Sequence, residues 1–295
     1  MYAQIDSNKR KTVILIVIFI VFVIFLGWLY GYFTETGYTG LIVAGLISFF
    51  MAATSYFAGD KIALTAAGAK QINEEQNPRL YHLVENLCIT AGLPIPNIYT
   101  INDEGINAFA TGRDVNHSSI ALTAGAINKL ADIELEGVIA HELSHIKNYD
   151  IRLMMVVLVL VGIIALISDW LLRGFLWRGQ GDRKNNAGAI LLIIGIILAI
   201  LSPLIAQIIQ LAVSRKREYL ADADGALLTR YPDGLANALE RISQENIKPL
   251  IRANNAMAHL YIASPFGQTK KFLTTLFSTH PPIEDRIAKL RQMTQ

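Results

Sequence analysis

Long apolar stretches dominate this sequence and limit what it can fold into. The first runs from Thr12 to Phe33 and the second from Gly37 to Gly59, and neither contains a charged residue. About 20 apolar residues in a helix span the hydrocarbon core of a bilayer. Only 17% of the chain is charged, against about 25% in soluble domains. We therefore expect an integral membrane protein in which these two stretches are transmembrane helices.

Two further apolar stretches lie in the second half of the chain. One begins at Leu153 and stays uncharged to Ser168, which is short for a crossing, and the other runs from Ala187 to Val213. The last stretch contains two glutamines, which favour a protein-lined face. We interpret residues 153–213 as an apolar hairpin whose segments 153–172 and 187–213 either cross the bilayer or are embedded in it. The fold class is then a mainly α integral membrane protein with up to four transmembrane helices.

Basic residues near the ends of the apolar stretches predict the orientation of the chain. Three of them, Lys9–Lys11, precede the first stretch, whereas the loop between the first two stretches has no Lys or Arg. Because positive charge favours the cytoplasmic side, we expect residues 60–152 and 214–295 to lie in the cytoplasm. The basic loop Arg173–Lys184 does not fit this rule and leaves the depth of the hairpin open.

Charge and cysteine content exclude two classes of protein. The formal net charge of +2 is too small to suggest nucleic-acid binding. The single cysteine, Cys88, rules out an internal disulfide, and in an apolar setting such a residue is usually part of the core.

The two polar segments predict helices and a small antiparallel β-sheet. Asn77 and Pro78 are typical of a helix start and Gly92 of its end, and a second helix is expected over 133–148. Prolines at 232 and 281–282 mark further helix starts. Short strand-like runs are found at Asn97–Ile101, Ala108–Thr111 and Ser118–Thr123.

The strongest local motif is His141-Glu142-Leu143-Ser144-His145. Residues four apart share one face of a helix, so both imidazoles can bind the same metal ion. Two neutral imidazoles and a carboxylate suit Zn2+, which keeps a position open for water in catalytic sites. The motif is the zincin signature, in which Glu142 acts as the general base. We predict one zinc ion per chain, bound by His141 and His145.

A second acidic pair, Glu218 and Asp222, is again four residues apart on one helical face. We predict that Glu218 is the third zinc ligand and that Asp222 orients a ligand histidine through its other ring nitrogen. The helical spacing alone also allows Asp222 or Asp224 to be the ligand. A solvated acidic face is the remaining alternative.

Taken together, the motifs resemble the HtpX family of membrane-bound zinc metalloproteases, distantly related to the CaaX prenyl proteases. The resemblance covers the whole chain and also rests on Asn107–Gly112, Ser214–Asp222 and Ser278–Pro282 with Arg286. It implies a zincin-type endopeptidase, a hydrolase of peptide bonds, in the bacterial inner membrane. Such an enzyme would act on misfolded or damaged membrane proteins in quality control and stress response.

The resemblance also implies how substrate is held and cleaved. An edge strand can bind any extended peptide through its backbone, which gives broad specificity. Here the strand would contain Asn107, Ala108, Phe109 and Ala110. The oxyanion needs a further hydrogen-bonding partner, for which His280 is favoured over Arg217 and Tyr219.

Two other functions compete with quality control. A processing protease with one dedicated substrate would have the same sequence features. A transporter or a metal-binding membrane protein without catalysis would place its polar residues near the bilayer midplane, whereas here they lie outside the apolar stretches. Glu142 also has no evident use in a metal carrier. The oligomeric state is left open.

Overall fold

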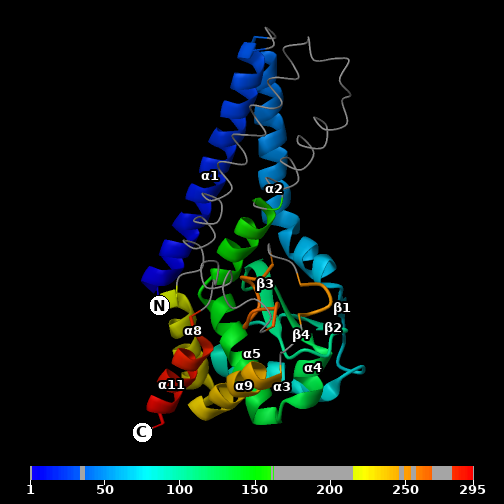
Figure 1. The fold of residues 1–295 in the computed structure, drawn as a ribbon, viewed down its shortest axis with the longest axis vertical. Coiled ribbons are helices and arrows are strands. Elements are labelled where there is room, and N and C mark those ends of the chain that lie inside the picture. Colours follow the sequence, from blue (N-terminus) through cyan, green and yellow to red (C-terminus); the bar gives the residue numbers. More distant parts are fainter. Residues whose placement is uncertain are drawn as a thin grey trace.

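A two-helix hairpin stands on a domain of shorter helices and one sheet (Figure 1). The computed structural model describes residues 2–33, 37–160, 162, 215–245, 249–253, 257–267 and 281–294. Most of the apolar hairpin predicted over 153–213, including the basic loop Arg173–Lys184, lies outside these residues. His280 lies outside them as well.

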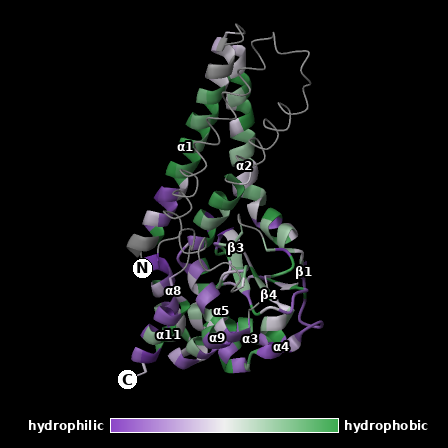
Figure 2. Cartoon of the chain, viewed as in Figure 1, coloured by the Kyte–Doolittle hydropathy of each residue, from purple (hydrophilic) through white to green (hydrophobic). Residues whose placement is uncertain are grey.

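The hairpin consists of α1 (Tyr2–Phe33) and α2 (Thr39–Ala67). Both helices are long and apolar enough to cross a membrane, as predicted for the first two stretches. Hydrophobic residues occupy most of the hairpin (Figure 2), and many of its large apolar side chains are exposed, with Phe50 at 66%. A contiguous apolar surface of this size fits lipid rather than water. Both helices also continue beyond the predicted stretches toward the domain, to Tyr2 and to Ala67.

Glycines allow the two helices to approach each other closely at the end remote from the domain. A Cβ atom at Gly27 would lie 2.2 Å from the Cβ of Ala44, and one at Gly40 would lie 2.5 Å from the carbonyl oxygen of Gly27. Close contact through small residues is typical of helix pairs in lipid.

A third helical segment begins where the domain meets the hairpin. Residues 150–160 are helical. Met155, Val156 and Leu160 form one buried cluster with Phe19 of α1, and Met51 of α2 packs against it. The third apolar stretch therefore starts as a helix packed against both α1 and α2.

The sheet has four strands in the order β1-β2-β4-β3. The strands are β1 (Ala69–Gln71), β2 (Asn97–Ile101), β3 (Ala108–Asp114) and β4 (His117–Thr123). The prediction of an antiparallel sheet was wrong in one respect, because β2 and β4 pair in parallel. The reason is that β4 returns antiparallel to β3 and inserts between β3 and β2, which leaves β3 at the edge.

The domain helices begin and end close to the predicted positions. In α3 (Pro78–Ala91) the Asn77 side chain accepts a hydrogen bond from the backbone N–H of Leu80, and Gly92 ends the helix in the left-handed conformation. The HExxH segment lies on α5 (Asp132–Lys147), which follows the short α4 (Ala124–Lys129). The remaining helices are α8 (Arg215–Thr229), α9 (Pro232–Glu245) and α11 (Ile283–Gln292).

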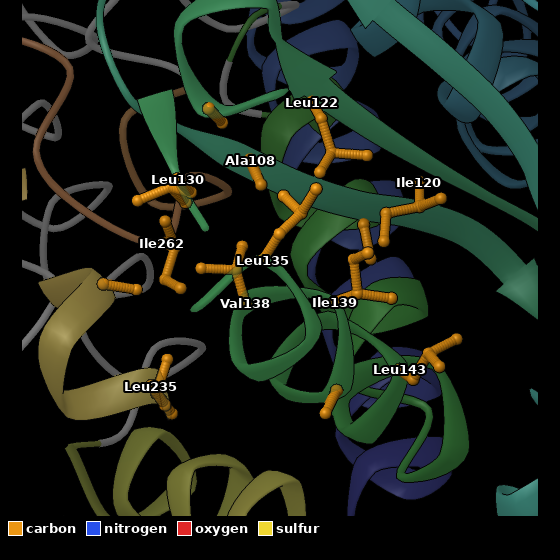
Figure 3. Close-up of a cluster of buried hydrophobic side chains, with 14 of the residues drawn as sticks. Ala108, Ile120, Leu122, Leu130, Leu135, Val138, Ile139, Leu143, Leu235 and Ile262 are labelled. Carbon is orange, nitrogen blue, oxygen red and sulfur yellow. The ribbon is translucent and has the colours of Figure 1, made fainter. Parts of the chain in front are cut away.

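One hydrophobic core contains residues that precede segment 153–213 in the sequence and residues that follow it. Side chains of α5 such as Leu135 and Ile139 meet Ile120 and Leu122 of β4, and Leu235 of α9 lies in the same cluster (Figure 3). Cys88 is fully buried in this core, as predicted. The segments before and after the apolar hairpin thus fold together, and α5 runs through their middle.

Candidate active site

The central helix α5 presents His141, Glu142 and His145 in the interior of the domain, all of them buried. Glu134 begins this helix by accepting a hydrogen bond of 2.8 Å from the backbone N–H of Ala131. The two imidazoles are one helical turn apart and lie on the same face, and their ring centroids are 4.7 Å apart.

A carboxylate fixes the orientation of each imidazole. Nδ1 of His141 lies 2.9 Å from Oδ1 of Asp222, and Nδ1 of His145 lies 3.0 Å from Oδ2 of Asp150. A carboxylate accepts a hydrogen bond, so each Nδ1 carries a proton and each Nε2 is the nitrogen left to bind a metal ion. Both histidines are therefore held in the tautomer that binds a metal through Nε2.

The two Nε2 atoms converge with Glu218 on one point. They lie 3.2 Å apart, and the carboxylate oxygens of Glu218 lie 3.8 Å from Nε2 of His141 and 3.7 Å from Nε2 of His145. All three residues are buried, and their candidate ligand atoms lie within 4.8 Å of one another. Two nitrogens bound tetrahedrally at about 2.0 Å from one zinc ion lie about 3.3 Å apart, so this donor set fits the ion.

A glycine allows α8, which carries Glu218 and Asp222, to lie against α5. A Cβ atom at Gly225 would lie 3.0 Å from the backbone nitrogen of His141. Only a residue without a side chain fits there with ordinary contacts. Gly225 thus sets the distance between the helices at the point where the two acidic side chains reach the histidines.

Arg286 of α11 neutralises Asp222. Its guanidinium donates to both carboxylate oxygens, at 2.9 and 2.7 Å, and to the carbonyl oxygen of Ile262 at 2.8 Å. Burial alone would raise the pKa of Asp222. The charge of Arg286 and the hydrogen bond from His141 outweigh that effect and lower the pKa to about 2. Asp222 therefore stays an anion and an acceptor for His141.

Glu142 is the one acidic side chain on the buried face of the HExxH segment. Its carboxylate oxygens are buried and make no hydrogen bond within the described part of the chain. Burial is the main cause that raises the pKa of Glu142 to about 7, and the negative charge of Glu218 adds to it. A carboxyl group whose pKa is near neutral pH is suited to take up and release a proton.

Comparison with known proteins places this arrangement in a family. The model of peptidase family M48 matches residues 74–294, which contain every side chain of the histidine and carboxylate cluster. The chain belongs to peptidase family M48. It is a membrane-associated metallopeptidase, a hydrolase of peptide bonds.

Relatives of this M48 protease extend over nearly its whole length. The chain is 47% identical to a protease HtpX homolog of Dictyoglomus thermophilum, covering 99% of this chain and 94% of the relative. It is 45% identical to a protease HtpX homolog of Tropheryma whipplei, covering 99% and 98%. The resemblance to the HtpX family is therefore confirmed.

A solved structure shares the fold. The crystal structure of S. mikatae Ste24p superimposes with a TM-score of 0.52 over 98% of this chain and 67% of that protein, at 17% identity. The two proteins thus share a fold although most of their residues differ.

The predicted substrate strand of the M48 domain is the edge strand β3. The backbone N–H of Ile262 already donates to the carbonyl oxygen of Ala108, and the Asn107 side chain donates to the carbonyl oxygen of Ala263. Backbone groups on an antiparallel strand alternate in direction, so Ala110 points the same way as Ala108. Its N–H also lies close enough to Glu142 to favour the charged carboxylate. Among the predicted residues, Ala110 is the one beside the site.

The remaining predicted residues of the M48 protease have other surroundings. Arg217 is buried and lies 3.3 Å from Asp150, while the ring of Tyr219 lies under the ammonium group of Lys289 at 3.3 Å. Asp224 accepts a hydrogen bond from Asn148. The oxyanion partner therefore remains a prediction, with His280 outside the described residues.

Sequence reasoning missed Asp150, which orients His145. The residue comes five positions after His145 and is not on the same helix, because α5 ends at Lys147 and the chain turns at Tyr149 with φ of 59°. No periodic pattern marks such a contact. An acidic residue just after the motif was the available signal.

Proposed function

We propose that this chain is a zinc endopeptidase that cleaves misfolded or damaged membrane proteins at the cytoplasmic face of the bacterial inner membrane, as part of a stress response. The observation that carries the proposal is the position of the candidate metal ligands, close to the domain end of the α1–α2 hairpin. His145 lies in the same helix–turn–helix as residues 150–160, which pack against α1 and α2. The site would therefore encounter the loops and tails of membrane proteins before it encounters soluble proteins.

Zinc is favoured by the type of donors as well as by their spacing. Two neutral imidazoles and one carboxylate are typical ligands of catalytic zinc sites. Carboxylates such as Asp222 and Asp150, which accept hydrogen bonds from the other nitrogen of each imidazole, are typical of such sites as well. When bound, zinc would polarise the scissile carbonyl and make water more acidic. His141, His145 and Glu218 would hold the ion. Glu142 would take the proton of the attacking water and pass it to the leaving amine.

Substrate would bind as an extended chain along β3. The outward backbone groups of Ala110 can pair with the main chain of any peptide, which would allow cleavage without strong side-chain preference. Asn107, Ala108 and Phe109 would shape the same strand. Because a folded substrate offers no free main chain, the site would select unfolded segments.

The side of the membrane follows from charge. The start of α1 lies on the same side as the domain (Figure 1), and Lys9–Lys11 belong to this end. The positive-inside rule assigns that side to the cytoplasm. A protease added outside intact cells should then leave residues 60–150 uncut. Cleavage there in sealed cells would reverse the orientation.

The activity can be tested in vesicles that contain the purified protein. The substrate is a single-span membrane protein with an unfolded tail, compared with the same tail lacking its anchor and with a folded domain in its place. We expect fast cleavage of the anchored unfolded tail, slow cleavage of the other two, and none after chelation or in Glu142→Gln. Equal cleavage of anchored and free tails would contradict a membrane-protein substrate. Cleavage at one fixed sequence would favour a dedicated processing protease.

A further inference from the structure

A polar residue of the first membrane helix is buried against the metal-binding region. Asn8 of α1 is fully buried. Its amide nitrogen donates one hydrogen bond of 2.6 Å to Oδ1 of Asp150 and another of 2.9 Å to the carbonyl oxygen of Asn148. Both acceptors lie in the sequence just after α5, the helix that carries the two histidines.

The assignment of the amide follows from its partners. A carboxylate and a carbonyl can only accept hydrogen bonds, so the side of Asn8 that faces them must be the NH2 group. Asn8 thereby uses both of its amide hydrogens on the end of α5. Asn148 is the C-cap residue of that helix, where backbone carbonyls lack partners within the helix.

Asp150 connects Asn8 to a metal ligand. Its Oδ2 accepts from Nδ1 of His145, while its Oδ1 accepts from Asn8 and lies 3.3 Å from Nη1 of Arg217. Arg217 immediately precedes Glu218 on α8. The carboxylate of Asp150 therefore contacts side chains from α1, from α5 and from α8.

The neighbouring residue on α1 reinforces this contact. The ammonium group of Lys9 lies 4.6 Å from the ring centroid of Tyr149, the residue in the left-handed turn before Asp150. A cation over an aromatic face is attracted by the ring. Two successive residues of α1 thus contact Asn148, Tyr149 and Asp150, where α5 ends and the next helical segment begins.

We propose that Asn8 is a positioning residue for the metal site, so that the first membrane helix is part of that site. Docked α1 holds Asp150 in the rotamer that keeps Nε2 of His145 aimed at Glu218. When α1 moves away, Asp150 loses its neutral donor, and His145 loses its orientation. The family match begins at residue 74, so it does not include α1. The inference rests on the proposed roles of His145 and Glu218.

The first test measures zinc affinity by competition with a chelator, in purified full-length protein. Carboxylates and their supports around a zinc site typically contribute 10–100-fold to affinity. We expect Asn8→Ala to weaken zinc binding about 10-fold and Asn8→Asp to weaken it more, because a second carboxylate would face Asp150. Thr12→Val is the matched control, since Thr12 is buried on the same helix and donates only to the carbonyl of Asn8. It should bind zinc within about twofold of the original chain.

A double-mutant cycle shows whether Asn8 acts through Asp150. Asn8→Ala should weaken zinc binding in the original chain but have little further effect when Asp150→Asn is already present. Additive losses would mean that Asn8 acts on the domain in general, which would overturn the proposal. Zinc affinity equal to the original chain in Asn8→Ala would overturn it too.

A second measurement needs no variant and decides the matter if Asn8→Ala does not fold. Linkage is reciprocal, so zinc should stabilise the docking of α1 by the same factor by which docking tightens zinc binding. Hydrogen exchange at residues 5–12 should slow when zinc is added, whereas β1, at the sheet edge opposite β3, should change little. Unchanged exchange in α1 would contradict the proposal. If the original chain bound no zinc at all, the proposed function would fail instead.

Discussion

Arg286 holds Asp222 at both carboxylate oxygens in a site where the arginine is 1% exposed. The same carboxylate accepts from Nδ1 of His141, so α11 supports a histidine of α5 through a residue of α8. The last helix of the domain is therefore connected to the metal-binding face by a chain of two charged contacts.

Removing Arg286 should destabilise the fold severely. In Arg286→Met the carboxylate of Asp222 stays buried without its cation, which typically costs about 3–5 kcal/mol. Denaturant unfolding in detergent measures the loss. The control Arg79→Met removes an exposed ion pair with Asp132 and should cost less than about 1 kcal/mol. Similar losses in the two variants would mean that the buried pair has no special role.

Replacing Glu142 should separate activity from metal binding. Glu142→Gln keeps the size of the side chain but removes the proton acceptor, so peptide cleavage should fall by at least about 100-fold. Bound zinc should be unchanged, and thermal stability should be equal or higher because a buried charge without a hydrogen bond is lost. Activity within a few fold of the original would remove Glu142 from the mechanism.

Glu218 and Asp222 of α8 should differ in their effect on zinc. Glu218→Gln takes away the charged donor beside both Nε2 atoms, so most zinc should be lost. Asp222→Asn keeps a partner for His141 and should weaken affinity by about 10–100-fold. Metal titration of both purified variants compares them directly. Tighter binding by the Glu218 variant than by the Asp222 variant would reverse the assignment.

A side chain at Gly225 should disturb the site without touching a ligand. In Gly225→Val the new atoms meet the backbone of His141, so α8 must move away from α5. Zinc affinity and cleavage should both fall by about 10-fold or more. Gly45→Ala is the control, because its Cβ would meet only Ile24 at 3.9 Å and should change neither quantity. Unaffected zinc binding in Gly225→Val would show that the helix spacing is not critical.

Local patterns predicted most elements and the histidine pair, because those depend on neighbours along the chain. Asn77 and Gly92 bound α3 as expected, and the spacing of His141 and His145 alone brings them to one face. The parallel pairing of β2 with β4 was missed, since it depends on which strand inserts where and not on the residues of either strand.

The same limit applies to the support of the site. Asp150 and Asn8 reach it through a turn and through the packing of a membrane helix, neither of which has a periodic signature. Arg286 was noted as part of a motif, but its pairing with Asp222 needed the position of α11. Contacts between distant segments are set by tertiary packing, which a single sequence does not display.

The order of the cluster residues along the chain has a consequence for biosynthesis. His141 and His145 leave the ribosome before the apolar residues 153–213, and Glu218 follows only after them. A nascent chain that ends before Glu218 therefore has an incomplete set of candidate donors. Cleavage that depends on all three donors can begin only after residues 153–213 have been synthesised, so a partly made chain is inactive toward the other chains emerging beside it.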